Sequence, residues 1–295
     1  MSQSADAGSS ETPNLLLPPR RRWLSGRRAI IASSLSSVLL LGGIIAVLYL
    51  APGGATVRGA FFDPHSMWQA FVGDPNKGLS SVGKGLLTNA WMFVAAEALV
   101  LFFGLLLAWV RLSHSPVLFP FRVLSTMYTD VFRGVPILLV IFVVGFGVPA
   151  LQLGAISNQS PAVYGVAALT ITYSAYVAEV FRAGIYSVPQ GQLLAARSLG
   201  LAHSTTMRRV ILPQAIRTVI PPLLNDFISL QKDTALVSTL GAIEATRAAQ
   251  IYASTEFNFS SYTVASLLFL ALTIPLTRFT DRLIAKDRNK RLASA

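Results

Sequence analysis

Long intervals without a charged residue do most to limit how this chain can fold. No Asp, Glu, Lys or Arg lies between Arg28 and Arg58. A mostly apolar stretch of roughly 20 residues is enough to cross the ~30 Å hydrocarbon core of a bilayer as a helix. Only 13% of the residues are charged and 53% are hydrophobic, whereas a typical soluble protein has about 25% charged residues. The sequence therefore predicts an integral membrane protein.

Six segments are long and apolar enough to be spans. They are residues 29–51, 86–110, 135–151, 162–182, 213–240 and 262–284. The first is too long for the apolar part of a signal peptide, which is roughly 7–15 residues. The uncharged interval between Arg133 and Glu179 is too long for one helix, and the polar sequence at 152–161 divides it in two. We expect an all-α membrane fold with about six helices.

The distribution of Lys and Arg predicts the orientation of these helices. Nineteen of the 24 cationic residues lie in the N-terminal tail and in segments 111–133, 182–217 and 278–291. Short loops rich in Lys and Arg stay on the cytoplasmic side, so both termini are expected to be cytoplasmic. The net charge of +11 is then a topology signal, and no nucleic-acid partner is expected.

The chain divides into five predicted regions. Residues 1–28 form a disordered, basic cytoplasmic tail, and 29–51 form an added N-terminal helix. An external loop with a short interfacial helix follows at 52–85. The core spans 86–285 and includes a cytoplasmic loop at 183–213, and a basic tail ends the chain at 286–295.

The external loop contains a near match to a phosphate-binding loop. The sequence GLSSVGKG at 78–85 has the two glycines and the lysine, but Gly85 replaces the Ser or Thr that holds magnesium. No buried strand precedes it, and we expect no nucleotide site there.

The cytoplasmic loop has the pattern of two short helices joined at a glycine. Pro189 precedes a helical stretch at 190–199, and Gly200 offers the left-handed conformation that ends a helix. A second short helix at 204–210 leads to Pro213 at the membrane entry. This helix–Gly–helix elbow, basic on one face, is a plausible docking surface for another protein.

The elbow resembles the EAA loop of bacterial ABC-importer permeases, whose pattern is Glu-Ala-Ala, three residues, Gly, nine residues, Ile, any residue, Leu-Pro. Ala195, Ala196, Gly200, Leu212 and Pro213 match it, and Val210 stands for the Ile. Leu194 departs from it, where the family usually has Glu. In the family this loop docks on the ATP-hydrolysing subunit. The resemblance implies an ATPase-coupling set here: Gln192, Leu194, Ala195, Ala196, Gly200, Arg208, Leu212 and Pro213.

Four further segments extend the resemblance over roughly 86–285. They are YTDVFRGVP at 128–136, SAYVAEVFRAG at 174–184, PPLLNDFISLQKDTALVSTLG at 221–241 and EATRAAQ at 244–250. Together they are similar to the polar amino acid uptake branch, the histidine, arginine, glutamine, glutamate and cystine permeases. The resemblance implies a type I ABC-importer transmembrane domain with a five-helix core, to which 29–51 adds one helix.

The same resemblance implies the partners. Separate ATP-binding cassette subunits would bind ATP and Mg, a second permease would complete the pathway, and an external substrate-binding protein would deliver a polar amino acid. The setting would be the bacterial cytoplasmic (inner) membrane. This chain itself is expected to bind no cofactor and to be no enzyme, since it shows no Ser–His–acid set and no His cluster with metal-ligand spacing.

Ionisable residues within spans are expensive and suggest function. Glu97 and Asp226 lie deep in their predicted helices. Either could face the pathway or form an interhelical hydrogen bond; both alternatives stay open for Glu97, and the hydrogen bond is favoured for Asp226. The stretch Lys232, Asp233 and Thr234 resembles the family's KDT sequence, and pairing with a neighbouring helix is favoured there over direct substrate contact. Glu179 and Arg182, three residues apart, are expected to pair or to stabilise the loop.

Two other classes of membrane protein fit the same composition. A gradient-driven secondary transporter or channel would use the carboxylates of Glu97, Asp226 and Asp233 as ion relays. A membrane scaffold would show no transport at all, but polar residues within its spans would then have no purpose.

Overall fold

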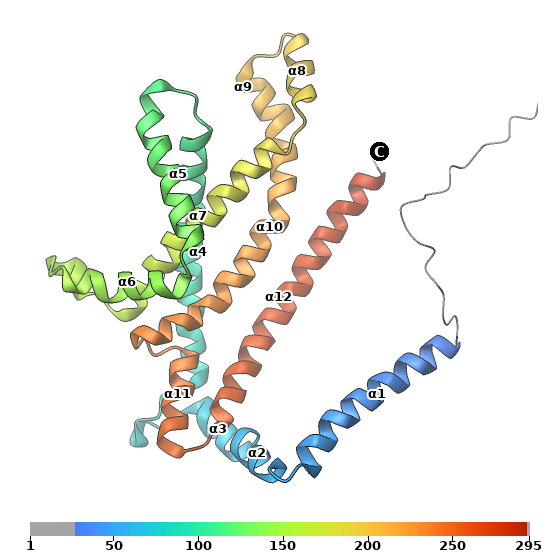
Figure 1. The fold of residues 1–295 in the computed structure, drawn as a ribbon, viewed down its shortest axis with the longest axis vertical. Helices are drawn as coiled ribbons and strands as arrows, with labels where there is room; N and C mark the ends of the chain where they lie inside the picture. The colour runs from blue at the N-terminus through green and yellow to red at the C-terminus, as the bar shows by residue number, and fades with distance from the viewer. Residues whose placement is uncertain (1–26, 294–295) are drawn as a thin grey trace, which may run out of the picture. The chain divides into compact units, whose positions relative to one another are not determined.

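The computed structural model describes residues 27–293, and within them every regular element is helical (Figure 1). The chain divides into two compact units, one up to Val57 and one from Arg58 onward. The predicted tail at 1–28 lies almost wholly outside the described residues. In the first unit, α1 (Arg27–Leu50) matches the predicted span 29–51. Its described side chains are largely exposed, Leu39 and Leu50 among them, as expected of a helix with an apolar surface on all sides.

The predicted external loop is mostly helical. It contains α2 (Gly54–Phe61), α3 (Pro64–Val72) and a 3₁₀ turn, η1 (Pro75–Lys77). Asp63 caps α3 by accepting a hydrogen bond from the Ser66 backbone N–H at 2.8 Å, and the hydrogen bonds from Ser66 lower the pKa of Asp63. The Asp63 backbone N–H in turn donates to Ser260 Oγ at 3.1 Å. The loop is thereby attached to the start of the last helix.

Two long helices form the centre of the second unit. They are α4 (Val82–Leu112) and α7 (Pro161–Tyr186), and α7 is the most buried of the long apolar helices. Gly104 permits their close approach, because a Cβ there would lie 2.7 Å from Val177 Cγ1. Their shared core includes Met92, Leu169 and Val177.

The third predicted span, 135–151, forms a single helix, but the segment before it differs from the expectation. Residues 111–133 were expected to be a cytoplasmic connection between two spans. Instead α5 (Phe119–Gly134) and α6 (Ile137–Ala150) meet at an angle of 109°. Pro136 explains the break, because it lacks a backbone N–H and disfavours helical conformation at Val135. Val135 is accordingly extended, with φ −91° and ψ 131°.

The fifth predicted span, 213–240, also differs from the expectation. It consists of α10 (Leu212–Asp233), which passes into a 3₁₀ segment, η5 (Thr234–Leu240). Gly241 ends this segment with φ +87°. The chain continues through α11 (Ala245–Glu256) and the long α12 (Ser260–Ala293). In the described part of the chain, four helices are long and apolar enough to cross a membrane, and the bent α5–α6 pair could be a fifth. The charged α10 does not meet that criterion.

Candidate functional site

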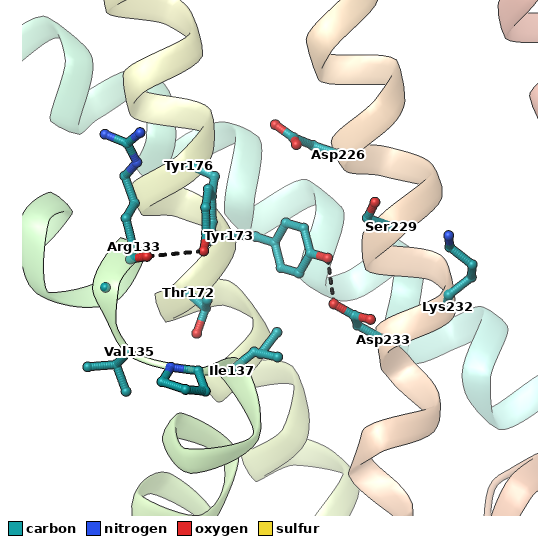
Figure 2. Close-up of a pocket in the computed structure, with 12 residues that line it drawn as sticks. Arg133, Val135, Ile137, Thr172, Tyr173, Tyr176, Asp226, Ser229, Lys232 and Asp233 are labelled. Atoms are coloured by element: carbon teal, nitrogen blue, oxygen red, sulfur yellow. Dashed lines mark hydrogen bonds between the residues drawn. The ribbon is translucent and has the colours of Figure 1, made fainter.

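The α5–α6 break opens a cavity beside α7 and α10. Its volume is about 540 Å³, and Figure 2 shows the side chains around it. The cavity is lined by Arg133, Gly134, Val135, Pro136, Ile137, Thr172, Tyr173, Tyr176, Asp226, Ser229, Lys232 and Asp233.

Helical spacing brings the polar lining residues together. On α10, Asp226, Ser229 and Asp233 are separated by three and four residues and so share one face. On α7, Tyr173 donates a hydrogen bond from its Oη to Asp233 Oδ2 at 2.7 Å. The neighbouring Tyr176 Oη donates to the Arg133 carbonyl oxygen at the break, at 3.4 Å. The three elements are thus cross-linked around the cavity by polar contacts.

The predicted intramembrane carboxylates have different environments. Asp233 makes the interhelical contact that the sequence analysis favoured, and it also lines the cavity. Among the described residues, none forms an interhelical hydrogen bond with Asp226, and its Oδ2 is buried without a partner; the interhelical bond favoured for Asp226 is therefore not observed. Glu97 on α4 lies close enough to Asp226 for their carboxyl groups to interact electrostatically. Glu97 is not among the residues that line the cavity.

The side chains of Lys232 and Thr234 do not share the helix face that holds the Asp233 carboxylate. Lys232 is exposed, borders a second pocket between α10 and α12, and in Figure 2 extends to the opposite side of α10 from the two Asp carboxylates. Thr234 is fully buried. Its Oγ1 accepts a hydrogen bond from Asn89 Nδ2 at 3.0 Å, so it serves the packing of α4 against η5 and lies outside the cavity lining.

A buried polar cluster that the sequence analysis missed lies next to Thr234. Glu244, fully buried, caps α11 by accepting hydrogen bonds from the backbone N–H groups of Thr246 and Arg247 at 2.9 and 2.7 Å. Asn89 Nδ2 donates to the same carboxylate at 2.9 Å, and Asn89 Oδ1 accepts from the Ala245 N–H at 3.0 Å. An acidic residue before a helix signals a cap, but no sequence signal joins positions 155 residues apart.

The end of the bundle nearest the elbow has a second polar cluster. Glu179 pairs with Arg182, as expected, and also accepts a hydrogen bond from Arg111 Nη1 at 2.9 Å. Arg133 Nη1 lies 4.0 Å from the same carboxylate. One carboxylate therefore joins α4, α5 and α7, and the pairing with Arg111 was not predicted.

The predicted elbow is present as two short helices. The first is α8 (Gln190–Ser198), followed by Gly200 with φ +73°; the second is α9 (His203–Thr206), which continues through a π-helical turn, η4 (Met207–Ile211), directly into α10. Leu193 packs on a small apolar core around Ile211 and Ala215. The elbow is thus continuous with the helix that carries Asp226 and Asp233 (Figure 1).

The residues of the predicted coupling set differ in exposure. Ala196 is only 5% exposed and lies on the buried face of α8, whereas Leu194 is 62% exposed. The remaining members are exposed as well: Gln192, Ala195, Gly200, Arg208, Leu212 and Pro213. Gln192 Oε1 accepts a hydrogen bond from Gln214 Nε2, which fixes α8 to α10.

The segment GLSSVGKG has no phosphate cradle. Ser81 caps α4 by accepting a hydrogen bond from the Lys84 N–H at 3.0 Å. Gly83 packs on Phe71, and Gly85 on the backbone of Ala245. Both glycines therefore serve helix packing. Among residues 27–293, no group of three or more His, Cys, Asp or Glu side chains is placed to hold a metal ion.

Known proteins similar to this chain are permeases. The probable amino-acid permease protein YxeN of Bacillus subtilis (strain 168) is 38% identical over 194 residues, which cover 65% of this chain and 84% of the relative. The arginine transport system permease protein ArtQ of the same organism is 33% identical and covers 66% and 86%. The probable glutamine ABC transporter permease protein GlnP, also from B. subtilis, is 32% identical and covers 70% and 93%.

Solved structures agree with these sequences. An amino acid ABC transporter crystallised with histidines is 32% identical, with a TM-score of 0.64, covering 70% of this chain and 93% of the other. The methionine transporter MetNI has an 18% identical chain with a TM-score of 0.55, covering 77% and 99%, which shows the shared fold. The family model for the binding-protein-dependent transport system inner membrane component matches residues 100–287. The chain belongs to this family and is the membrane-spanning permease subunit of an ABC importer, whose ATPase activity resides in separate subunits.

Proposed function

We propose that this chain forms, with a second permease, the pathway by which a polar amino acid crosses a bacterial cytoplasmic membrane. An external binding protein delivers the substrate, and ATPase subunits that bind ATP and Mg dock on the elbow. Both termini then lie in the cytoplasm.

The cavity between the α5–α6 break, α7 and α10 is the observation that carries this proposal. A free amino acid has a carboxylate and an ammonium group, and it requires partners of both signs when water is removed. The cavity lining contains Arg133 for the carboxylate and Asp226 and Asp233 for the ammonium group. Tyr176, Ser229 and further hydroxyl groups in the lining would hydrogen-bond a polar side chain.

The continuity of the elbow with α10 supports the coupling. Leu212 at the start of α10 and Asp226 in the cavity are separated by about 21 Å of helix, at 1.5 Å per residue. A displacement of the elbow by docked ATPases would therefore move the Asp226 and Asp233 face relative to α7. Differential nucleotide binding by the ATPases supplies the free energy for switching between outward-facing and inward-facing states.

Reconstitution separates this function from gradient-driven transport. Proteoliposomes that contain the chain with its partner permease and ATPases should accumulate a radiolabelled amino acid when ATP is inside and binding protein is outside. An ATPase variant without hydrolysis should abolish uptake. Equal uptake by the permease alone, driven by a proton or sodium gradient, would contradict the proposal and favour ion relays through Glu97, Asp226 and Asp233.

A further inference from the structure

We propose that the cavity selects cationic amino acids, such as arginine, lysine or ornithine, over neutral and acidic ones. This inference rests on the proposed function and gives the substrate class of the same site. The observations that carry it are the charges around the cavity, their present partners and their spacing on α10.

The carboxylates at the cavity lack cationic partners. Among the described residues, the ion pairs are those between Lys77 and Glu256 and those of the three arginines around Glu179. None of them includes Asp226, Asp233 or Glu97. Asp226 has a buried oxygen without any hydrogen-bond partner, and Glu97 lies near it. Asp226 and Glu97 therefore form an acidic pair without a cationic partner among the described residues, next to Asp233.

The two cations of the lining form no ion pair with these carboxylates, although Lys232 interacts electrostatically with Asp233. Arg133 is within 4.0 Å of Glu179, with which it shares the arginine cluster. Lys232 is exposed and extends away from the Asp226 and Asp233 carboxylates in Figure 2. The face of α10 toward α7 is therefore acidic, with Arg133 at the opposite wall.

The spacing of the two aspartates suits a substrate with two positive groups. Asp226 and Asp233 are two helical turns apart, which corresponds to about 10 Å along α10. Ser229 lies between them on the same face and adds a hydroxyl group. A basic amino acid can place its α-ammonium group at one carboxylate and its side-chain cation at the other, with its α-carboxylate toward Arg133. A neutral amino acid leaves one carboxylate uncompensated, and an acidic one adds a like charge.

Direct binding to the membrane complex tests this class without the selectivity of the external binding protein. The full chain, purified with its co-expressed partner permease and ATPases in lipid nanodiscs, is titrated with radiolabelled L-arginine, L-lysine, L-glutamine and L-glutamate. We expect arginine and lysine to bind at least tenfold more tightly than glutamine, and glutamate to bind most weakly.

Two cavity variants and one matched control assign the binding to this site. Asp226→Asn should weaken arginine binding at least tenfold and reduce its preference over glutamine. Asp281→Asn, an exposed aspartate on α12 outside the cavity lining, should bind arginine as the unmodified chain does. Ser229→Lys places a tethered cation between the two aspartates and should abolish arginine binding, which decides the question if Asp226→Asn does not assemble.

The outcomes separate the substrate class from the proposed function. Glutamine or glutamate bound as tightly as arginine, and lost in the Ser229→Lys variant, would overturn the cationic class while leaving an amino acid permease. Arginine binding unchanged in both cavity variants would also overturn it. Failure of the intact importer to take up any amino acid with ATP would overturn the proposed function itself.

Discussion

The left-handed glycine of the elbow allows a sharp test of ATPase coupling. Gly200 has φ +73°, and a Cβ added there would meet no atom within 4 Å. Its backbone N–H donates to the Arg197 carbonyl at 2.9 Å, and the next N–H, of Leu201, donates to the Ala196 carbonyl at 3.2 Å. Alanine at position 200 therefore introduces backbone strain without a steric clash.

The magnitude follows from the cost of left-handed backbone. A residue with a Cβ costs about 1–2 kcal/mol in this conformation, while asparagine adopts it more readily. The exposed elbow can release the strain by unwinding the end of α8 when it is free, but it must restore the turn to dock. The penalty then appears in the docking affinity, as about a five- to thirtyfold weaker Kd for Gly200→Ala. Gly200→Asn should lose much less affinity.

The assay is binding of the ATPase subunit to the nanodisc-held permease, measured by biolayer interferometry, together with the number of ATP molecules hydrolysed per substrate transported. Gly191→Ala, on α8 with open space around it, is the control for an added methyl group. The bulkier Gly200→Arg and Gly200→Glu should uncouple hydrolysis from uptake.

Equal behaviour of the alanine and asparagine variants would refute the reasoning. If both bind the ATPase as tightly as the unmodified chain, the turn is not required for docking. If both bind equally weakly, a side chain at position 200 blocks the surface, and backbone strain is not the cause. Retained coupled transport in the Gly200→Arg variant would remove the elbow from the coupling pathway.

Three further changes test the bundle. Asn89→Ala removes three buried hydrogen bonds, including one to the Glu244 carboxylate. It should lower the free energy of unfolding by about 3 kcal/mol. A melting temperature in detergent equal to that of the unmodified chain would contradict this. Gly85→Ala puts a Cβ 2.5 Å from a backbone nitrogen of α11, whereas Gly134→Ala meets nothing within 4 Å, so only the first should reduce the yield of monodisperse protein on size exclusion. Glu97→Ala should reduce uptake while the complex still assembles, because it removes a carboxylate that interacts with Asp226; unchanged uptake would exclude a pathway role.

Local features of the sequence were the most predictable part of the structure. The helix at 190–199, the glycine that ends it and the second helix before Pro213 all follow from short-range rules about propensity and caps, and α8, Gly200 and α9–η4 confirm them. The docking of an ATPase on this elbow remains a prediction. The long apolar stretches that became α1, α4, α7 and α12 were also identified, because hydropathy over about 20 residues depends little on tertiary context.

The misjudged segment before α6 contains a local signal with an ambiguous meaning. Hydropathy reports that 116–134 and 137–150 together are apolar enough for the membrane, but it does not report whether the helix bends. Pro136 favours a break over a straight span, since the residue before proline avoids helical backbone. The size of the bend, 109°, is set by how α6 packs on α7 and Leu240, which are distant in sequence.

The polar pairs show why the site itself could be assembled only from the structure. The sequence identifies these residues because an ionisable group within a span costs free energy. That cost does not say which partner each residue has. Glu179, Asp233 and Glu244 make hydrogen bonds with residues 60 or more positions away.

These partners divide the intramembrane carboxylates into two kinds. A carboxylate with several donors stabilises the packing of the helices that supply them, and its replacement is expected to reduce stability. Asp226 and Glu97 have no such donors among the described residues, so each raises the free energy of the folded chain without improving its packing. A costly group that the fold does not use for its own stability is most simply explained by a ligand that uses it. From the sequence, an interhelical hydrogen bond is the favoured role of Asp226; the unpartnered Oδ2 supports a role in binding a ligand instead.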